Sequence, residues 1–365
     1  MIRITTIIGA RPQFIKASVM SRCFSASEFV EEVLVHTGQH FDYNMSDVFF
    51  TQLKIPAPKY NLGIHNAPHG KMTGQMLMGI ENVLMEEKPD YVLVYGDTNS
   101  TLAGALAAKK LNIPVIHVEA GLRSRNNKMP EEINRILTDR ISDLLCCPTD
   151  TALENLRLEG FKSFDASFQK TGDVMEDALK YYERFEDTSG IIDRLQVAPE
   201  KYVLCTVHRA ENTDIQENLS QIMEALVLIA DQTDVVLPLH PRTRSILKSL
   251  PHHKNLHLID PVGYLECLHL IKEANMVLTD SGGMQKEAYM FKKFCITLRD
   301  ETEWTELTAL SCNFLTGAKK KLILETYNAV QKLSWQAPDD LYGGGKAHER
   351  IYDMILMDAR KRGII

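Results

Sequence analysis

The chain has 365 residues, of which 44% are hydrophobic, so it is long enough to bury two ordinary hydrophobic cores. Its formal net charge of −7 excludes the broad basic face that nucleic-acid binders carry. No apolar run approaches the roughly 20 residues of a membrane helix, and the seven cysteines lack the CxxC spacing of a metal or redox site. We therefore expect a cytoplasmic protein with reduced thiols that binds neither nucleic acid nor membranes.

Short β-branched runs alternate with helical patterns through the first half of the chain. The predicted strands are Ile2–Ile8, Glu32–His36, Tyr91–Tyr95 and Val115–Val118, and the predicted helices are Gln13–Phe24, Met72–Glu87, Ser100–Leu111 and one that begins at Pro130. Between them, Lys54–Lys71 contains three Pro and two Gly and predicts a long functional loop. This order of elements is typical of a parallel sheet with helices on both faces.

The second half shows the same alternation of strands and helices. Its predicted strands are Tyr202–Val207, Val235–Leu239, Leu256–Ile259, Met276–Thr279 and Phe294–Leu298. We predict an N-terminal domain over residues 1–172 and a second domain over residues 173–346. A last helix within 347–365 is expected to pack back on the first domain. The predicted fold class is α/β, with two Rossmann-like domains whose parallel sheets face a central cleft.

The junction Asp280-Ser281-Gly282-Gly283 follows a buried strand and opens a helix. Small residues leave the first backbone N–H groups of the helix open, and the helix dipole is positive at that end. Such a helix start suits a phosphate. The alternative is a tight turn that needs Gly for backbone reasons alone.

Polar residues also follow the other predicted strands, where ligands bind in open α/β sheets. They include Arg11, Gln39, His40, Asp97, Glu119, His208, His240 and Arg242. Each has a plainer interpretation: Asp97 as a helix N-cap, His208 as a hydrogen-bonded core histidine, and Lys16 as a surface lysine. Glu131 could be only a first-turn acid that the helix dipole favours. The convergence of these residues at strand ends predicts a site there.

Two common cofactor patterns are missing from the sequence. No GxGxxG follows the first strand, because Gly9 stands alone there, and no HExxH is present. We therefore predict that the protein uses no NAD and no metal.

Several motifs, in chain order, resemble the non-hydrolysing UDP-N-acetylglucosamine 2-epimerases. They are Gly9–Lys16, Gly96-Asp97-Thr98, His117–Arg123, Pro130–Arg135, His208–Asn212, and Asp280–Gly283 with Gln285 and Glu287. The resemblance covers nearly the whole chain. It implies the two-domain fold of one large class of glycosyltransferases (GT-B-like), a UDP-sugar substrate and a homodimer.

The resemblance also implies roles for single residues. Asp97, Glu119 and Glu131 would be the catalytic carboxylates, and His208 would contact the departing UDP. The nucleotide and phosphate binders would be Arg11, Lys16, Arg135, Ser281, Gly282, Gly283 and Glu287. Gln39 and His40 lie where some bacterial members bind a second, allosteric UDP-sugar. The family reaction is anti elimination of UDP to a 2-acetamidoglucal, followed by re-addition with the opposite configuration at C2.

Two departures from the simplest members of this family concern the substrate. Trp304 stands where those members have arginine, and Arg242 stands where they tend to have asparagine. The sequence therefore looks more like the branch that acts on UDP-2,3-diacetamido-2,3-dideoxy-glucuronic acid for surface polysaccharides. We expect Arg242 to bind the C6 carboxylate of that sugar. The alternatives are a surface position for Arg242, plain UDP-N-acetylglucosamine as substrate, and a glycosyltransferase of the same fold.

Overall fold

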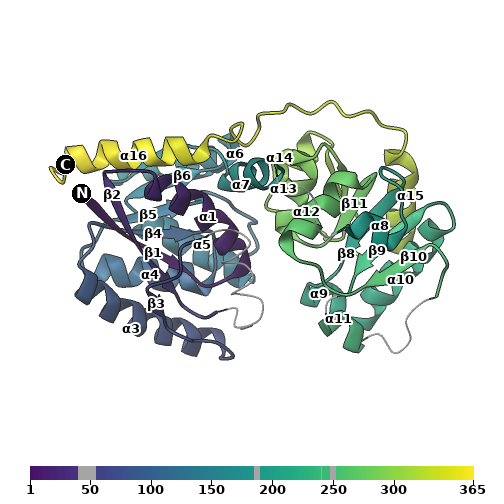
Figure 1. Ribbon diagram of the computed structural model, residues 1–365, viewed down its shortest axis with the longest axis horizontal. Helices are drawn as coiled ribbons and strands as arrows, with labels where there is room; N and C mark the ends of the chain where they lie inside the picture. The colour runs from purple at the N-terminus through teal and green to yellow at the C-terminus, as the bar shows by residue number, and fades with distance from the viewer. Residues whose placement is uncertain (40–54, 185–189, 240, 247–251) are drawn as a thin grey trace. The chain divides into compact units, whose positions relative to one another are not determined.

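The computed structural model describes residues 1–39, 55–184, 190–239, 241–246 and 252–365, except for the side chains of Pro241, Arg242 and Ser245. It divides into two compact units, which are described separately (Figure 1). Unit 1 comprises Met1–Ala178 and Asp340–Ile365, and unit 2 comprises Leu179–Asp339. The division falls inside helix α7 (Val174–Tyr182). The boundary at residues 172 and 173 and the facing of the two sheets stay predictions.

Unit 1 is built on a seven-stranded parallel sheet with the order β3-β2-β1-β4-β5-β6-β7. Its strands are β1 (Ile2–Ile8), β2 (Val30–His36), β3 (Tyr60–Asn61), β4 (Tyr91–Tyr95), β5 (Val115–Val118), β6 (Leu144–Cys147) and β7 (Ser167–Lys170). Strands β4 and β5 are buried at every residue, as expected for a parallel sheet covered on both faces. Because β1, β4 and β5 are neighbours, their carboxyl ends lie side by side.

The helices of unit 1 follow its strands closely. They are α1 (Arg11–Ser25), α3 (His69–Glu87), α4 (Asn99–Lys110), α5 (Pro130–Ile141), α6 (Asp150–Leu158), the 3-10 turn η1 (Phe161–Ser163), most of α7, and α16 (Ala347–Lys361). Small residues let α4 approach the sheet: a Cβ on Gly104 would lie 3.1 Å from side-chain atoms of Ile7 and Val94. This close packing fixes the start of α4 against the end of β4.

Unit 2 contains a six-stranded parallel sheet with the order β10-β9-β8-β11-β12-β13. Its strands are β8 (Tyr202–Thr206), β9 (Asp234–Pro238), β10 (Leu256–Ile259), β11 (Met276–Thr279), β12 (Phe294–Thr297) and β13 (Asn313–Leu315). Its other helices are α8 (Ile191–Leu195), α9 (Ala210–Thr213), α10 (Gln216–Ala230), α11 (Pro241–Ile246), α12 (Tyr264–Glu273), α13 (Gly282–Met290), α14 (Thr305–Ala309) and α15 (Lys320–Val330). Two separate apolar clusters pack against the sheet, one containing Leu278 and the other Val277.

The predicted α/β class and the predicted strands are confirmed in both units. Among the strands that the sequence did not predict, β3 and β13 have only two and three residues, which give too little periodicity to detect. One of them, β3, lies inside the segment predicted as a loop, where Tyr60 pairs with Val35, and α3 already begins at His69. That prediction was therefore wrong for these residues. In the part of the chain that the structure describes, no helix is long and apolar enough to cross a membrane.

The C-terminal helix α16 packs on unit 1, against α1 and β6 (Figure 1). Its first turn is capped by Asp177, whose carboxylate accepts hydrogen bonds from Ala347 N at 3.0 Å and His348 N at 3.3 Å. Near its end, Asp358 accepts a hydrogen bond of 2.7 Å from the hydroxyl of Tyr91 in the central strand β4. The last segment of the chain is thus an integral part of unit 1.

The His348–Asp177 pair makes the stability of unit 1 depend on pH. The two side chains lie 3.2 Å apart, and the hydrogen bond and charge of Asp177 raise the pKa of His348 above its usual value. Protonated His348 therefore stabilises the fold below about pH 6.5, and this contribution is lost as pH rises through the raised pKa. We expect His348→Gln to lower the melting temperature more at pH 6 than at pH 9. Equal losses at both pH values would contradict this linkage.

Candidate active site

In unit 1, the turn after β1 is fixed to the end of β4 by one buried side chain. The Oε1 atom of Gln13 accepts hydrogen bonds from Gly9 N at 2.9 Å and Ala10 N at 3.0 Å. Its Nε2 atom donates to the carbonyl of Tyr95 at 2.9 Å. Helix α1 therefore begins at a fixed position beside the carboxyl end of β4.

Lys16 and Glu119 form a buried ion pair at this edge. Their Nζ and Oε2 atoms are 2.5 Å apart, and their side chains are only 8% and 9% exposed. The interpretation of Lys16 as a surface lysine is therefore wrong. Glu119 has φ of +74°, a strained conformation that non-glycine residues seldom adopt and that is often found at functional sites. Gly96 leaves room for the pair, because a Cβ there would lie 3.3 Å from the Lys16 ammonium.

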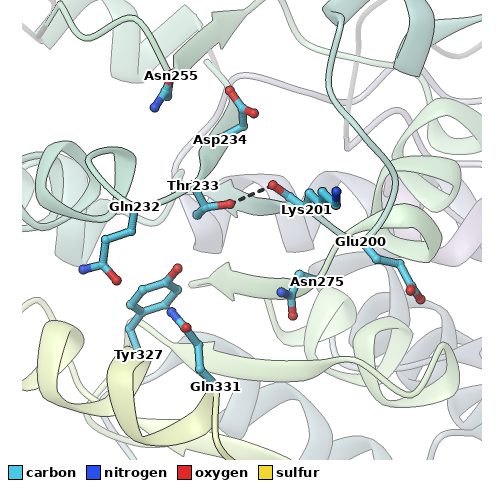
Figure 2. Close-up of a pocket in the computed structure, with 9 residues that line it drawn as sticks. All are labelled: Glu200, Lys201, Gln232, Thr233, Asp234, Asn255, Asn275, Tyr327 and Gln331. Atoms are coloured by element: carbon cyan, nitrogen blue, oxygen red, sulfur yellow. Dashed lines mark hydrogen bonds between the residues drawn. The ribbon is translucent and has the colours of Figure 1, made fainter.

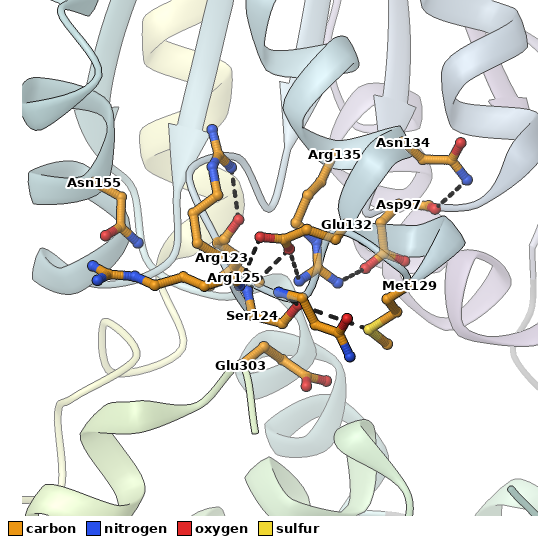
Figure 3. Close-up of polar contacts among 12 residues, drawn as sticks. Asp97, Arg123, Ser124, Arg125, Met129, Glu132, Asn134, Arg135, Asn155 and Glu303 are labelled. Atoms are coloured by element: carbon orange, nitrogen blue, oxygen red, sulfur yellow. Dashed lines mark hydrogen bonds and ion pairs between the residues drawn. The ribbon is translucent and has the colours of Figure 1, made fainter. Parts of the chain in front are cut away.

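Asp97 lies at the end of β4 and forms an ion pair with Arg135 from α5 (Figure 3). The N-cap of α4 is Thr98, whose hydroxyl accepts a hydrogen bond from Thr101 N, so the interpretation of Asp97 as that cap is wrong. Asn134 donates to the Asp97 carbonyl at 2.9 Å. Two side chains of α5 therefore fix both the backbone and the carboxylate of Asp97.

A buried network behind the edge connects the strands that carry the two carboxylates. His117 Nδ1 lies 2.7 Å from Asp139 Oδ1, and its Nε2 lies 2.8 Å from the carbonyl oxygen of Gly96. Asp139 also accepts hydrogen bonds from Gly121 N at 3.1 Å and from Arg123 at 2.7 Å. Burial alone would raise the pKa of Asp139, but His117 and Arg123 lower it below its usual value. An ionised Asp139 thus stabilises the backbone on either side of the site.

Glu131, the third predicted carboxylate, lies in the first turn of α5 and is half-buried. A first-turn acid is favoured by the helix dipole wherever it occurs. Its position is therefore compatible with both interpretations, and its catalytic role stays a prediction.

In unit 2, a buried aspartate fixes the predicted histidine. Asp280 accepts hydrogen bonds from the backbone N–H groups of His208 and Arg209, both at 3.0 Å, and from Asn212 at 3.1 Å. Its Oδ1 atom lies 3.2 Å from Nδ1 of His208, whose side chain is 46% exposed. The interpretation of His208 as a core histidine is therefore wrong. Asp280 itself was named from the sequence as part of the strand-end junction but was given no role of its own.

Helix α13 begins at the predicted anion site. Ser281 is its N-cap and accepts a hydrogen bond from Met284 N at 3.5 Å. A Cβ on Gly282 would lie 2.3 Å from the Glu303 carboxylate, whereas a Cβ on Gly283 would meet no atom within 4 Å. At Gly282 a side chain would therefore displace the Glu303 carboxylate. Gly283 leaves the helix start open, as a bound anion requires.

Next to this helix start, Trp304 is 3% exposed, and the Lys286 ammonium lies 4.0 Å from the centroid of its ring. A buried lysine therefore accompanies the tryptophan that replaces the arginine of the simpler family members. Glu287, on the following position of α13, is also buried.

Some predicted residues cannot be placed. His40 and His240 lie outside the described residues, and so does the side chain of Arg242, although its backbone belongs to α11. Gln39 is described, and its Oε1 atom accepts hydrogen bonds from Ser100 N at 3.1 Å and Ser100 Oγ at 2.8 Å. Gln39 is thus attached to the start of α4, and the second UDP-sugar site stays a prediction.

An open cavity of about 520 Å³ lies at the amino edge of the sheet in unit 2 (Figure 2). Its lining consists of Glu200, Lys201, Gln232, Thr233, Asp234, Asn255, Asn275, Tyr327 and Gln331. Most of these side chains are amides and hydroxyls, and the cavity contains none of the predicted site residues. The location of the chemistry at the carboxyl edges of the sheets stays a prediction. Among the described residues, no group of three or more His, Cys, Asp or Glu side chains could hold a metal ion.

Paired carboxylates at one sheet edge and an open helix start at another are typical of an α/β enzyme that binds a phosphorylated ligand and moves protons. The chain belongs to the UDP-N-acetylglucosamine 2-epimerase family, whose model matches residues 22–356. The resemblance found in the sequence motifs is thereby confirmed.

Three relatives place the chain within this family. The UDP-2,3-diacetamido-2,3-dideoxy-D-glucuronate 2-epimerase of Pseudomonas aeruginosa is 52% identical over 97% of this chain and 99% of its own length. The UDP-N-acetylglucosamine 2-epimerase of Methanocaldococcus jannaschii is 43% identical over 96% and 97%. The crystal structure of an M. jannaschii UDP-GlcNAc 2-epimerase in complex with UDP-GlcNAc and UDP has a TM-score of 0.88 over 98% of this chain and 100% of that chain, at 40% identity.

A more distant structure, the spinosyn rhamnosyltransferase SpnG, has a TM-score of 0.55 at 11% identity. This likeness shows only that the fold is shared with a glycosyltransferase. The predicted GT-B-like fold class is confirmed.

The contact between Gly282 and Glu303 can be tested by stability. Gly282→Ala would displace Glu303 from its ion pair with Arg299, whose Nη1 lies 3.0 Å from Oε2. We expect this substitution to lower the free energy of unfolding by about 1–3 kcal/mol. In a Glu303→Ala background the same substitution is expected to be neutral or stabilising, because alanine is the better helix former. Equal destabilisation in both backgrounds, measured by denaturant unfolding, would show that Glu303 is not the reason for the glycine.

Proposed function

We propose that the protein inverts the configuration at C2 of a UDP-N-acetylglucosamine-type sugar without hydrolysing the UDP-sugar. The observation that carries this proposal is the pair of strand-end carboxylates, Asp97 and Glu119, each with its own buried cation. Membership of the UDP-N-acetylglucosamine 2-epimerase family supports the same reaction.

The reaction requires a proton to leave C2 on one face and to return on the other, so at least two acid/base groups must serve the sugar. A carboxylate removes the C2 proton while the C1–O bond to UDP breaks, and the electron pair of the C–H bond forms a C1–C2 double bond. UDP then adds back to C1 as C2 receives a proton on the opposite face. The two steps balance without an oxidant, and we propose Asp97, Glu119 and Glu131 as the proton carriers.

The departing UDP develops negative charge that must be stabilised. We propose that unit 2 supplies this stabilisation through the N–H groups at Ser281–Gly283 and through His208, which Asp280 holds in place. Glu287 is proposed to bind the ribose hydroxyls, and Arg11 of unit 1 to contact the nucleotide. We propose that Arg135 and Lys16 also act on UDP, in addition to their pairing with Asp97 and Glu119.

Exchange of the C2 proton with solvent tests the reaction. In deuterium oxide, the UDP-sugar recovered from the unmodified protein should carry deuterium at C2. Asp97→Asn and Glu119→Gln should each lower turnover by roughly 10²-fold while UDP binding stays nearly unchanged, as expected for acid/base groups. A glycosyltransferase of the same fold would instead leave C2 unlabelled and would transfer the sugar to an added acceptor. That result would refute the proposal.

For the substrate, we propose the 2,3-diacetamido-2,3-dideoxy-glucuronate form of the UDP-sugar. The P. aeruginosa relative that is 52% identical is named for this sugar. Compared with the simpler family members, Trp304 replaces an arginine and Arg242 is an added arginine, which supports a changed charge around the sugar. Plain UDP-N-acetylglucosamine is the second candidate, because the M. jannaschii relative is named for that activity. Roles in surface polysaccharide synthesis, a homodimeric state and a cytoplasmic location stay predictions.

Rates on the two UDP-sugars decide between these substrates. The unmodified protein should turn over the carboxylated sugar faster, and Arg242→Ala should remove most of that preference, because an arginine binds a carboxylate in bidentate geometry. Arg244→Ala is the matched control, since Arg244 lies on the same short helix and its Nη2 pairs with Asp260 at 2.8 Å. Faster turnover of UDP-N-acetylglucosamine would refute the substrate. Equal losses on both sugars in Arg242→Ala would remove Arg242 from this role.

A further inference from the structure

We infer that Glu132 is a positioning residue for the epimerisation, which orients Arg135 and the loop 121–129 and, through them, Asp97. This inference rests on the proposed function. Glu132 lies next to the predicted catalytic Glu131, but the two side chains have different surroundings: Glu132 is 1% exposed, whereas Glu131 is half-buried. A side chain so fully buried acts through its protein partners.

Three donors form hydrogen bonds with the Glu132 carboxylate (Figure 3). Its Oε2 atom accepts hydrogen bonds from Ser124 N at 2.9 Å and from Arg135 Nη1 at 3.0 Å. Its Oε1 atom accepts one from Arg125 N at 2.8 Å. Because all three partners donate, only a group with two acceptor oxygens satisfies them, and a carboxylate is such a group.

The two backbone hydrogen bonds fix the loop that joins Glu119 to α5. Arg125 has φ of +62°, a left-handed conformation that is unfavourable for arginine and needs support from its surroundings. Glu132 supplies that support from the first turn of α5. The loop, the helix start and the segment that begins at Glu119 are therefore held as one rigid piece.

The third hydrogen bond orients a guanidinium. Arg135 is 3% exposed, and its Nη1 pairs with Glu132 while its Nη2 pairs with Asp97. The planar fork of arginine thus joins two carboxylates in a fixed geometry. Without the Glu132 carboxylate, Arg135 Nη1 would lose this hydrogen bond, and the position of the guanidinium against Asp97 would change. A displacement of about 1 Å at a reacting group can lower a rate on the order of 10²-fold.

Glu132→Gln tests the inference with little change in size. Glutamine has one acceptor oxygen and one NH₂ group, so it must turn a donor toward at least one of the three donors. We expect kcat for epimerisation to fall by about 10- to 100-fold, while KM and inhibition by UDP change less than about threefold. The effects of Glu132→Gln and Asp97→Asn on kcat should be non-additive. The variant that carries both substitutions should be no more than about threefold slower than Asp97→Asn alone.

Asp143→Asn is the matched control. Asp143 accepts a hydrogen bond from Val115 N at 2.9 Å and pairs with Lys109 at 2.9 Å, so it too joins a backbone amide to a cation, but at the amino edge of the same sheet. This variant should lose thermal stability and keep kcat. If Glu132→Gln does not fold, Arg135→Lys is the second test, because a single ammonium cannot join both carboxylates and should lower kcat to a similar extent.

The outcomes separate the inference from the proposed function. Absence of deuterium at C2 with the unmodified protein would overturn both. Exchange in the unmodified protein, together with an unchanged kcat in Glu132→Gln or in Arg135→Lys, would overturn the inference alone. Additive losses in the Asp97→Asn double variant would also overturn it, since they would assign Glu132 to stability and not to the position of Asp97.

Discussion

The candidate active site depends on the pairing of two strand-end carboxylates with two buried cations. Glu119 pairs with Lys16 and Asp97 pairs with Arg135, and three of these four side chains are less than one-tenth exposed. A buried carboxylate without a partner would be strongly destabilising, because removal of a charge from water is unfavourable. The cations therefore offset the unfavourable burial of the carboxylates at this edge of the sheet. The fold provides them from helices that begin immediately beside the strands, α1 and α5.

A second layer of polar residues keeps these pairs in position. Gln13 ties the turn after β1 to the end of β4, and the His117–Asp139 pair ties the ends of β4 and β5 to α5. Each of these groups is buried and has its hydrogen-bonding atoms engaged by fixed partners, so none can move without leaving a polar group unsatisfied. Such an arrangement suits a reaction in which proton donors and acceptors must be in place before the sugar arrives.

The sequence was sufficient to predict the fold class, because parallel strands buried on both faces read as continuous apolar runs. Asp97, Glu119 and Ser281 were predicted as site residues because they closely follow those runs. Glu132 and Asp280 were given no role of their own, since their importance comes from hydrogen bonds to backbone groups outside their own elements. The burial of Lys16 was equally hidden, because a lysine on a first helical turn has the same pattern whether it faces water or a carboxylate. Ion pairs across the sheet edge form between separate elements of the folded chain, so the local periodicity of the sequence does not predict them.

The return of α16 to unit 1 has a consequence for biosynthesis. Residues 340–365 complete unit 1, but the ribosome makes them only after all of unit 2. Until then the surface that α16 covers, including the hydroxyl of Tyr91 and the thiol of Cys146, remains open to other partners. The sheet of unit 1 can begin to form early, but helix α16, which packs on this unit, is synthesised last. Unit 2 can thus finish folding during synthesis, whereas unit 1 reaches its native state only when residues 340–365 have left the ribosome.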